Sequence, residues 1–424
     1  MKKDRGMTRR DFIKTVGTST AAIGVGSMLP TLARPVKAAK RDYILIGHPT
    51  PSTGPIAGFG ETAAWITKRG VEEINQKGGI YIQEYGKKLP VRIKSVDTQS
   101  DPTQAGEIAS RLILNDKVDV MMVYGTPATV NPTTSICERY KVPCIATNAP
   151  IEMWLTGGPY HYSFLYFGLV PELFPAYYGM WELLGTNKVI GMLAANDVDG
   201  VAIVNTSKEI LIPRGYKIVD MGLVPYGLKD YSSIISAWKK ENVEIIFGNM
   251  IAPDWTAAWR QCARMGFKPK VATMGRSLLF PSDINAIGGE LPNGLTAEYW
   301  WGPTYPHKSS ITGYGPKDLC DAWEADTGKQ FIQTLGFEYA TFEVLYNALN
   351  KAQSLDKEKI REAIASTDFE AIVGNIKFTK ENYCAVPIVG AQWVKGKKWP
   401  WEPKVVFAGK HKHIPIQKEI IPIP

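Results

Sequence analysis

The sequence has little that would span a membrane, bind a metal or cross-link the chain. After residue 38, none of the 424-residue sequence offers about 18 consecutive apolar residues, the length that a membrane-spanning helix needs. Five cysteines are present, none in a C-x-x-C motif, and no Cys/His cluster has the spacing of a metal site. With 45% hydrophobic and 21% charged residues, the composition excludes a disordered chain. We therefore predict a globular protein without a metal or another cofactor.

The motifs of common enzyme classes are also missing. The sequence contains no G-x-S-x-G, H-E-x-x-H or G-x-x-x-x-G-K-[ST], and Gly58-Phe59-Gly60 is a G-x-G without the third glycine. The five histidines are scattered singly and offer no general base with an evident partner. We therefore predict that the protein is not an enzyme. The alternative is an exported enzyme with a cofactor, for which the sequence holds no motif.

The net charge of +8 is unevenly distributed along the chain. Residues 1–38 contain eight basic and two acidic groups, which leaves 41 basic and 39 acidic groups for the remainder. A strongly basic protein would suggest a nucleic acid or an anionic membrane as partner. Because the excess lies in the first tenth of the chain, we expect a nearly neutral body and no nucleic-acid partner.

Residues 1–38 have the three parts of a secretory signal: a charged start, an apolar run from Thr15 to Leu32, and a small residue, Ala38, at the cleavage site. The paired Arg9-Arg10 resembles the twin-arginine export signal. An uncleaved membrane anchor is the alternative, but glycines and a proline interrupt the apolar run. We expect a cleaved signal, the twin-arginine translocase as partner during export, and a soluble protein in the periplasm.

From residue 42 onward, short β-branched runs alternate with amphipathic stretches. Two such series, at 43–146 and 188–274, predict two doubly wound α/β lobes with parallel sheets. The aromatic segment Tyr160–Tyr178 between them is typical of a loop, which we interpret as a linker and a cleft wall. Long helices are expected at 316–327, 337–352 and 357–365, and strands at 294–300, 376–378 and 388–393. Ligands bind beyond the carboxyl ends of strands in open α/β sheets, so we expect a cleft between the lobes.

Four short segments occur in an informative order. They are Thr53-Gly54-Pro55-Ile56-Ala57-Gly58-Phe59-Gly60, Val71-Glu72-Glu73-Ile74-Asn75-Gln76-Lys77-Gly78-Gly79-Ile80, Asp97-Thr98-Gln99-Ser100-Asp101-Pro102 and Leu112-Ile113-Leu114-Asn115-Asp116-Lys117-Val118. This succession resembles the Leu/Ile/Val-binding family of periplasmic solute-binding proteins for ABC importers. The resemblance covers roughly residues 42–400 and is clearest in the first lobe.

The resemblance implies the type I periplasmic-binding-protein fold, in which two lobes joined by three crossing strands close on a ligand. It implies lobe 1 at 42–162 and 296–384, lobe 2 at 163–295 and 385–405, and a tail at 406–424. It further implies a small-molecule ligand (an amino acid, an amide or an aromatic or organic acid) that is handed to an ABC permease. A ligand sensor that docks on a receptor is the alternative with the same fold.

Lobe 1 offers a candidate carboxylate site where a strand meets a helix expected to begin near Asn131-Pro132. The backbone N–H groups of this loop, including that of Ala128, and the hydroxyls of Thr126 and Thr129 would receive the carboxylate there, helped by the helix dipole. Ordinary helix capping by the two threonines is the alternative. The resemblance adds Asn148 and Ala149 in the next loop. It also places Phe59 over the ligand as an aromatic lid, with a packed core residue as the alternative.

Lobe 2 departs from the pattern of amino-acid binders. Asp199 stands where the family has an aromatic residue, and Arg276 where an acidic residue often receives the ammonium. Arg276 would bind a second anionic group or pair with Asp199. Met250, at the end of another strand, completes the candidate ligand-binding residues. Five aromatic residues are further candidates for the cleft mouth or for an interface between the lobes: Tyr160, Tyr162, Tyr166, Trp300 and Trp301.

One pair of cysteines suggests a disulfide. Cys137 and Cys144 would connect a helix end to the following strand, in a compartment that permits oxidation. Two buried free thiols are the alternative.

Overall fold

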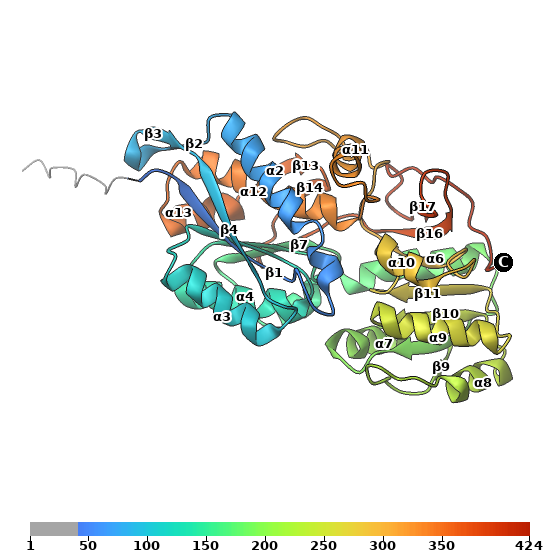
Figure 1. Cartoon of the computed structure of the whole chain (residues 1–424). Helices are drawn as coiled ribbons and strands as arrows, with labels where there is room; N and C mark the ends of the chain where they lie inside the picture. The colour runs from blue at the N-terminus through green and yellow to red at the C-terminus, as the bar shows by residue number, and fades with distance from the viewer. Residues whose placement is uncertain (1–40) are drawn as a thin grey trace, which may run out of the picture. The chain divides into compact units, whose positions relative to one another are not determined.

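Two β-sheets flanked by helices organise residues 41–424 of the computed structural model, which are the residues that the structure describes (Figure 1). The predicted twin-arginine signal, residues 1–38, lies outside the described residues. Among residues 41–424, no helix combines the length and the apolar character needed to cross a membrane. We call the part built on the first sheet lobe 1 and the part built on the second sheet lobe 2.

The sheet of lobe 1 has six parallel strands in the order β15-β7-β6-β5-β1-β4. Their bounds are β1 Ile44–Thr50, β4 Val91–Asp97, β5 Val120–Tyr124, β6 Cys144–Thr147, β7 Ser163–Phe167 and β15 Tyr383–Ala385. Strands β5, β6 and β7 are buried along their whole length, as strands covered on both faces must be.

Two groups of helices cover this sheet. They are α3 Pro102–Leu114 and α4 Pro127–Tyr140 on one face, and α2 Ala63–Gln76, α12 Thr334–Ala352 and α13 Lys357–Ala365 on the other (Figure 1). The short α5 Ile151–Leu155 packs beside α4 and β7. Two small hairpins complete the strands near this lobe: β2 Ile80–Ile82 with β3 Lys87–Leu89, and β13 Asp368–Ala371 with β14 Gly374–Lys377.

The sheet of lobe 2 has seven strands in the order β17-β16-β12-β11-β10-β8-β9. The strands are β8 Val189–Ala194, β9 Lys217–Asp220, β10 Ile245–Asn249, β11 Val271–Gly275, β12 Thr296–Tyr299, β16 Val389–Lys395 and β17 Trp401–Phe407. The strands from β9 to β12 are parallel, whereas β16 and β17 add an antiparallel edge. The helices are α6 Val170–Leu183, α7 Val198–Leu211, α8 Ser232–Lys240, α9 Ala252–Arg264 and α10 Pro281–Ile287.

The chain passes between the sheets three times, after β7, after β12 and after β15. The predicted α/β class and two-lobed architecture are confirmed, but two predicted boundaries are wrong. Strand β7, expected in lobe 2, pairs in parallel with β6 of lobe 1. Strand β12, expected in lobe 1, pairs with β11 and β16 of lobe 2. The chain therefore leaves lobe 1 after β7 and leaves lobe 2 after β12, whereas the prediction placed these two crossings before the strands.

The segment Tyr160–Tyr178, predicted as a loop, contains β7 and the first half of α6. Pro171 stands in the first turn of α6, where a missing N–H costs nothing, and Pro175 lies inside the helix. Helix α4 also begins earlier than predicted, at Pro127, and retains Pro132 in its interior. An internal proline therefore ends neither helix. Because α4 begins at Pro127, its N-cap residue is Thr126.

Residues after β17 run along lobe 2. The side-chain amide of Gln392 donates to the carbonyl of Ile421 at 2.7 Å and accepts from the Ile421 N–H at 3.0 Å. The N–H of Ile423 donates to the carbonyl of Lys270 at 3.0 Å. Helix α11, Pro316–Thr327, contacts both lobes. It packs against α12 of lobe 1, and its Glu324 accepts a hydrogen bond from the indole of Trp399, which lies between β16 and β17 of lobe 2.

Cys137 in α4 and Cys144 in β6 are buried free thiols in the structure. The structure therefore has two buried free thiols at these positions and not the suggested disulfide. Burial raises the pKa of Cys144 well above its ordinary value, with a smaller contribution from Cys137 beside it. A thiol held protonated in this way reacts slowly with oxidants, because the thiolate is the nucleophile.

Candidate functional site

A pocket with about 630 Å³ of open space lies where strand ends of both sheets meet. Five strand ends contribute polar or aromatic residues to it: Thr126 after β5, Asn148 after β6, Phe167 at the end of β7, Asn249 at the end of β10 and Arg276 after β11. The remaining lining residues are Phe59, Pro127, Pro150, Met153, Val170, Leu173, Tyr177, Asp199, Ala202, Ile203, Leu279, Glu298 and Trp300. Because parallel strands end at one edge, residues distant in sequence converge here.

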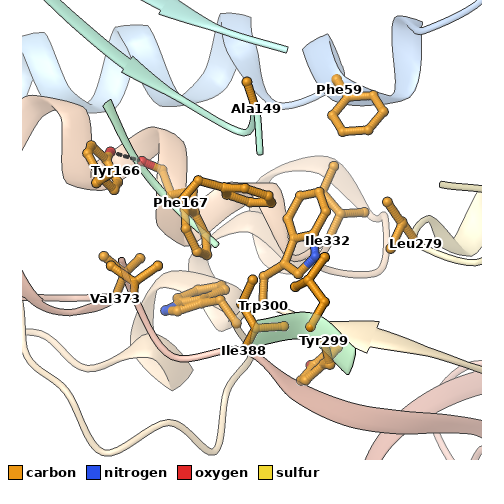
Figure 2. Packing of buried hydrophobic residues seen from close by; sticks show 14 of the residues in the cluster. Phe59, Ala149, Tyr166, Phe167, Leu279, Tyr299, Trp300, Ile332, Val373 and Ile388 are labelled. Carbon is orange, nitrogen blue, oxygen red and sulfur yellow. Dashed lines mark hydrogen bonds between the residues drawn. The ribbon is translucent and has the colours of Figure 1, made fainter. Parts of the chain in front are cut away.

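Aromatic rings form one side of the pocket and connect the lobes (Figure 2). Phe59, in the 3₁₀ turn Ala57–Gly60 of lobe 1, packs edge-on against Phe280 of lobe 2, with ring centroids 5.0 Å apart. Phe167 and Trp300 lie where two of the crossings begin, at the ends of β7 and β12, and pack edge-to-face with ring centroids 4.7 Å apart. Gly58 permits the first contact, since a Cβ there would lie 2.8 Å from the Phe280 ring.

The first polar group of lobe 1 is the start of helix α4. Thr126 occupies the N-cap position, but its side chain makes no capping hydrogen bond. The N–H groups of Thr129 and Val130 both donate to the Thr126 carbonyl at 3.0 Å. A helix begins with N–H groups that have no intrahelical acceptor, and its dipole favours an anion there. Pro127 has no N–H and those of Thr129 and Val130 are engaged, so the Thr126 hydroxyl and the Ala128 N–H are the groups here that can receive a carboxylate.

The second polar group of lobe 1 is the amide of Asn148. This side chain is 3% exposed, and neither its oxygen nor its nitrogen has a hydrogen-bond partner within residues 41–424. Its backbone has φ 68°, a left-handed conformation that asparagine tolerates better than most residues. A buried amide without partners costs free energy unless something else binds it, so Asn148 is a candidate recognition position.

The lobe 2 wall is built around the guanidinium of Arg276, whose side chain is 10% exposed. Its Nη1 donates to Asp197 Oδ2 at 2.8 Å and to Asp199 Oδ2 at 3.1 Å. Its Nε and Nη2 have no partner within the described part of the chain. Like Asn148, Arg276 follows a strand and has a left-handed backbone, with φ 65°. Two donor groups of a buried cation thus remain available in the pocket wall.

Electrostatics hold this cluster in defined charge states. Burial acts to lower the pKa of Arg276, but Asp199 and Asp197 outweigh it and the pKa is raised. Burial acts to raise the pKa of Asp197, but Arg276 and the neighbouring donors outweigh it and the pKa is lowered. For Asp199 burial dominates, so its pKa is raised. Arg276 and Asp197 are therefore firmly ionised, whereas Asp199 is the carboxylate that protonates most readily.

Further polar groups of lobe 2 lie beside Arg276. Glu298 of β12 is buried and accepts a hydrogen bond from the Tyr177 hydroxyl at 3.0 Å; burial raises its pKa. Asn249 Oδ1 has no partner among residues 41–424. The acidic and basic residues of the lining, Asp199, Arg276 and Glu298, thus all belong to lobe 2.

The structure brings five predicted site residues together in the pocket lining: Phe59, Thr126, Asn148, Asp199 and Arg276. Four others do not line it. Ala128 is exposed on α4, and Thr129, Ala149 and Met250 are buried behind the wall. Side chains of adjacent residues point to different sides of a loop or strand, so neighbours of a lining residue are turned away. Met250 instead accepts a hydrogen bond from the Ser277 hydroxyl through its carbonyl.

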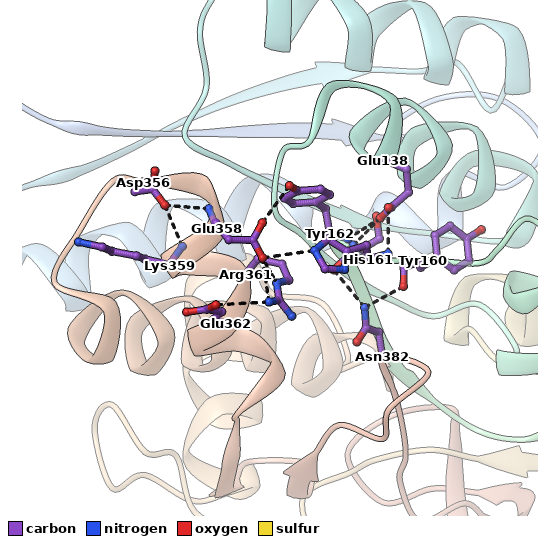
Figure 3. A network of polar contacts seen from close by, with 11 residues as sticks. Glu138, Tyr160, His161, Tyr162, Asp356, Glu358, Lys359, Arg361, Glu362 and Asn382 are labelled. Carbon is purple, nitrogen blue, oxygen red and sulfur yellow. Dashed lines mark hydrogen bonds and ion pairs between the residues drawn. The ribbon is translucent and has the colours of Figure 1, made fainter.

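Of the aromatic candidates, Trp300 lines the pocket, whereas the three tyrosines and Trp301 do not; the Trp301 indole donates to the carbonyl of Ile372 at 2.9 Å. Tyr160 stacks on Trp154 with 4.0 Å between ring centroids, and the Tyr166 hydroxyl donates to the carbonyl of Phe337. Tyr162 belongs to a separate polar network in which its hydroxyl donates to Glu358 at 2.9 Å (Figure 3). These tyrosines stabilise lobe 1 by linking elements distant in sequence.

Sequence reasoning missed most of the apolar lining. Val170, Leu173 and Tyr177 come from α6, which was predicted as a loop, so their helical spacing went unused. The apolar residues at i, i+3 and i+7 were the available signal. Asn249 and Glu298 sit on strands, where only the register decides which face a side chain joins.

Comparisons with known proteins agree on one family. Residues 44–396 match the family described as periplasmic binding protein. The chain is similar to the leucine-, isoleucine-, valine-, threonine- and alanine-binding protein of Pseudomonas aeruginosa, with 27% identity over 345 residues, 80% of this chain and 87% of that protein.

Solved structures show the same fold. A leucine-binding protein from Thermotoga maritima superposes with a TM-score of 0.70 at 21% identity, covering 86% of this chain and 98% of that one. A solute-binding protein of an ABC transporter from Rhodopseudomonas palustris, in complex with 3,4-dihydroxybenzoic acid, gives a TM-score of 0.69 at 18% identity, covering 88% and 99%. These likenesses span nearly the whole of residues 41–424.

Proposed function

The chain belongs to the periplasmic binding protein family, and from that premise we propose that it captures a small carboxylate-bearing solute between its lobes and delivers it to an ABC permease. Its relatives are binding proteins, and the names of two of them include both amino-acid and aromatic-acid ligands. No bond is made or broken in this function. The cycle takes place in the periplasm, after export that uses the predicted twin-arginine signal.

The observation that carries this proposal is the set of unpaired buried polar groups in the pocket. Within residues 41–424, Asn148 and Arg276 both hold side-chain atoms without hydrogen-bond partners. They stand on opposite lobes and line the same space. A ligand that bonds to both removes two desolvation costs at once, and it can do so only when the lobes are close.

We assign the ligand carboxylate to lobe 1. The Thr126 hydroxyl, the N–H of Ala128 and the amide nitrogen of Asn148 donate to it, and Phe59 covers the ligand body. Thr129, Ala149 and Met250 hold these loops from behind. Asp199 and Arg276 of lobe 2 complete the site on closure. Binding energy then stabilises the closed form, which the permease recognises.

The test is a thermal-shift screen of the mature protein against amino acids, amides, aromatic acids and other organic acids. We expect one class to raise the melting temperature in a saturable way. Thr126→Ala should weaken binding of that ligand by about 10- to 100-fold, the value of a hydrogen bond to a charged group. Thr103→Ala is the matched control, since Thr103 is an exposed first-turn threonine of α3 outside the pocket.

Two results would contradict the proposal. One is turnover of a solute by a protein that no small molecule stabilises. The other is unchanged affinity in the double variant Thr126→Ala, Asn148→Ala, which removes both lobe 1 contacts.

A further inference from the structure

The charge in the pocket is confined to one wall. The lining residues of lobe 1 are all uncharged: Phe59, Thr126, Pro127, Asn148, Pro150, Met153 and Phe167. An α-amino acid carries its ammonium one carbon from its carboxylate. If lobe 1 receives the carboxylate, the ammonium must find its partner nearby, and the described lining residues of lobe 1 include no carboxylate side chain, with the Asn148 amide oxygen as an unpaired buried side-chain acceptor. Lobe 1 is therefore suited to a carboxylate without an adjacent ammonium.

The opposite wall offers hydrogen bonds without a net positive charge, because Arg276 stands among the carboxyl groups of Asp197, Asp199 and Glu298. Asp197 and Asp199 share the Nη1 of Arg276, at 2.8 and 3.1 Å. A second carboxylate approaching Nε and Nη2 would meet a cation that is already neutralised, with a carboxylate beside it. An uncharged hydroxyl avoids this repulsion, because it can accept from the guanidinium and donate to Asp199.

The rest of the lining consists mainly of apolar and aromatic side chains. Phe59, Phe167 and Trp300 contribute rings, and Leu279 is another lining residue (Figure 2). Phe59 and Trp300 have ring centroids 6.2 Å apart and planes inclined by 32°. Ring faces of this kind favour a flat apolar body over a branched polar one.

We propose that the ligand is a monocarboxylate with a flat apolar body and an uncharged hydroxyl at its far end, and that Arg276 and Asp199 recognise that hydroxyl. This inference rests on the proposed function, since it takes the lobe 1 carboxylate site as given. Arg276 is thus the residue that determines specificity, and Thr126 and Asn148 supply affinity for the shared carboxylate.

The experiment measures dissociation constants by calorimetry for two pairs of probes of different length: 4-hydroxybenzoate with benzoate, and 3-(4-hydroxyphenyl)propionate with 3-phenylpropionate. Terephthalate and L-leucine are the competitors. In at least one pair we expect the hydroxylated acid to bind at least about 10-fold tighter than its partner, because a site with buried polar groups rejects an analogue that leaves them unpaired. It should also bind more tightly than terephthalate and leucine.

Arg276→Lys separates the two roles. Lysine keeps the positive charge beside the aspartates but lacks the planar donors, so the preference for the hydroxyl should fall to about 3-fold or less. Thr126→Ala should weaken both members of a pair equally and preserve their ratio. If Arg276→Lys does not fold, Asp199→Asn replaces it, and the hydroxylated acid alone should lose several-fold in affinity.

The outcomes distinguish the two proposals. Tightest binding of leucine or terephthalate overturns the hydroxyl assignment and leaves the binding function intact. An unchanged hydroxyl preference in Arg276→Lys, or in Asp199→Asn, also overturns it. If no carboxylate in the panel or in the wider screen binds, the proposed function itself fails.

Discussion

The two walls of the pocket are built by the same kind of βα loop but differ in chemistry. Lobe 1 presents an uncharged wall with the α4 N-terminus and the Asn148 amide. Lobe 2 presents a guanidinium, Arg276, held by two aspartates. Both walls hold their key residue in a left-handed backbone conformation after a strand. The shared geometry positions a ligand, and the difference in charge decides which ligand fits.

The largest effect should come from removing the cation of lobe 2. In Arg276→Ala, Asp199 keeps its burial but loses its counterion, so we expect the free energy of unfolding to fall by about 3 kcal/mol, as when one partner of a buried pair is removed. Denaturant titration measures this. Arg361→Ala is the control: Arg361 pairs with the half-exposed Glu358, and its loss should cost less than about 1 kcal/mol (Figure 3). Equal losses in the two variants would show that the buried ion pairs of Arg276 contribute no more to stability than the more exposed pair of Arg361.

The next effect should come from adding charge to lobe 1. Asn148→Asp places a carboxylate where the ligand carboxylate is expected, so affinity should fall by about 100-fold through like-charge repulsion at a buried position. Calorimetry with the ligand from the screen measures it. Asn242→Asp is the matched control, because Asn242 also has a left-handed backbone, φ 54°, but is exposed. Affinity retained in Asn148→Asp would show that the carboxylate binds elsewhere.

A smaller effect should follow when the walls are held apart. Gly58→Ala would put a Cβ 2.8 Å from the Phe280 ring of lobe 2, so the aromatic contact between the lobes must shift. We expect a loss of about 10-fold in affinity, because the misfit costs roughly 1–2 kcal/mol in the closed form. Gly106→Ala in α3 is the control, since its Cβ would meet its nearest neighbour at 3.8 Å. Native affinity in Gly58→Ala would show that closure of the lobes on the ligand does not depend on the Phe59–Phe280 contact.

The smallest effect concerns two carboxylates that face each other from the two lobes. Burial, and then the neighbouring Glu61, raise the pKa of Asp283 in α10 to about 6. A raised pKa means that the folded state binds the proton more tightly, so this stability is complete below about pH 4 and is lost as the pH rises through 6. Between pH 5 and 7 the loss should be about 1 kcal/mol.

Asp283→Asn should remove that part of the pH dependence. Denaturant titrations at pH 5 and pH 7 compare the two proteins, and the difference between the two pH values should shrink by the same amount in the variant. Lys329 partly neutralises Glu61, with 2.9 Å between Nζ and Oε1, and so limits the effect. An identical pH dependence in both proteins would contradict this role for Asp283.

The fold and half of the site could be predicted because both depend on repeated local patterns. Alternation of β-branched and amphipathic runs indicates parallel α/β lobes, and loops at strand ends indicate where polar residues such as Thr126 and Arg276 converge. What failed depends on pairing between distant segments. Whether β7 joins lobe 1 is decided by its hydrogen bonds to β6, and whether Ala149 or Asn148 faces the pocket is decided by a one-residue turn of the backbone. A single sequence carries neither fact directly.

The position of Phe167 and Trp300 has one more consequence. Both residues lie at crossings between the lobes and touch each other, and both line the pocket. In the proposed closure of the lobes on a ligand, the surface that contacts the ligand would therefore also lie at the hinge. In that proposed cycle, ligand binding and lobe closure act on the same two rings, so the environment of the Trp300 indole would change with both events together.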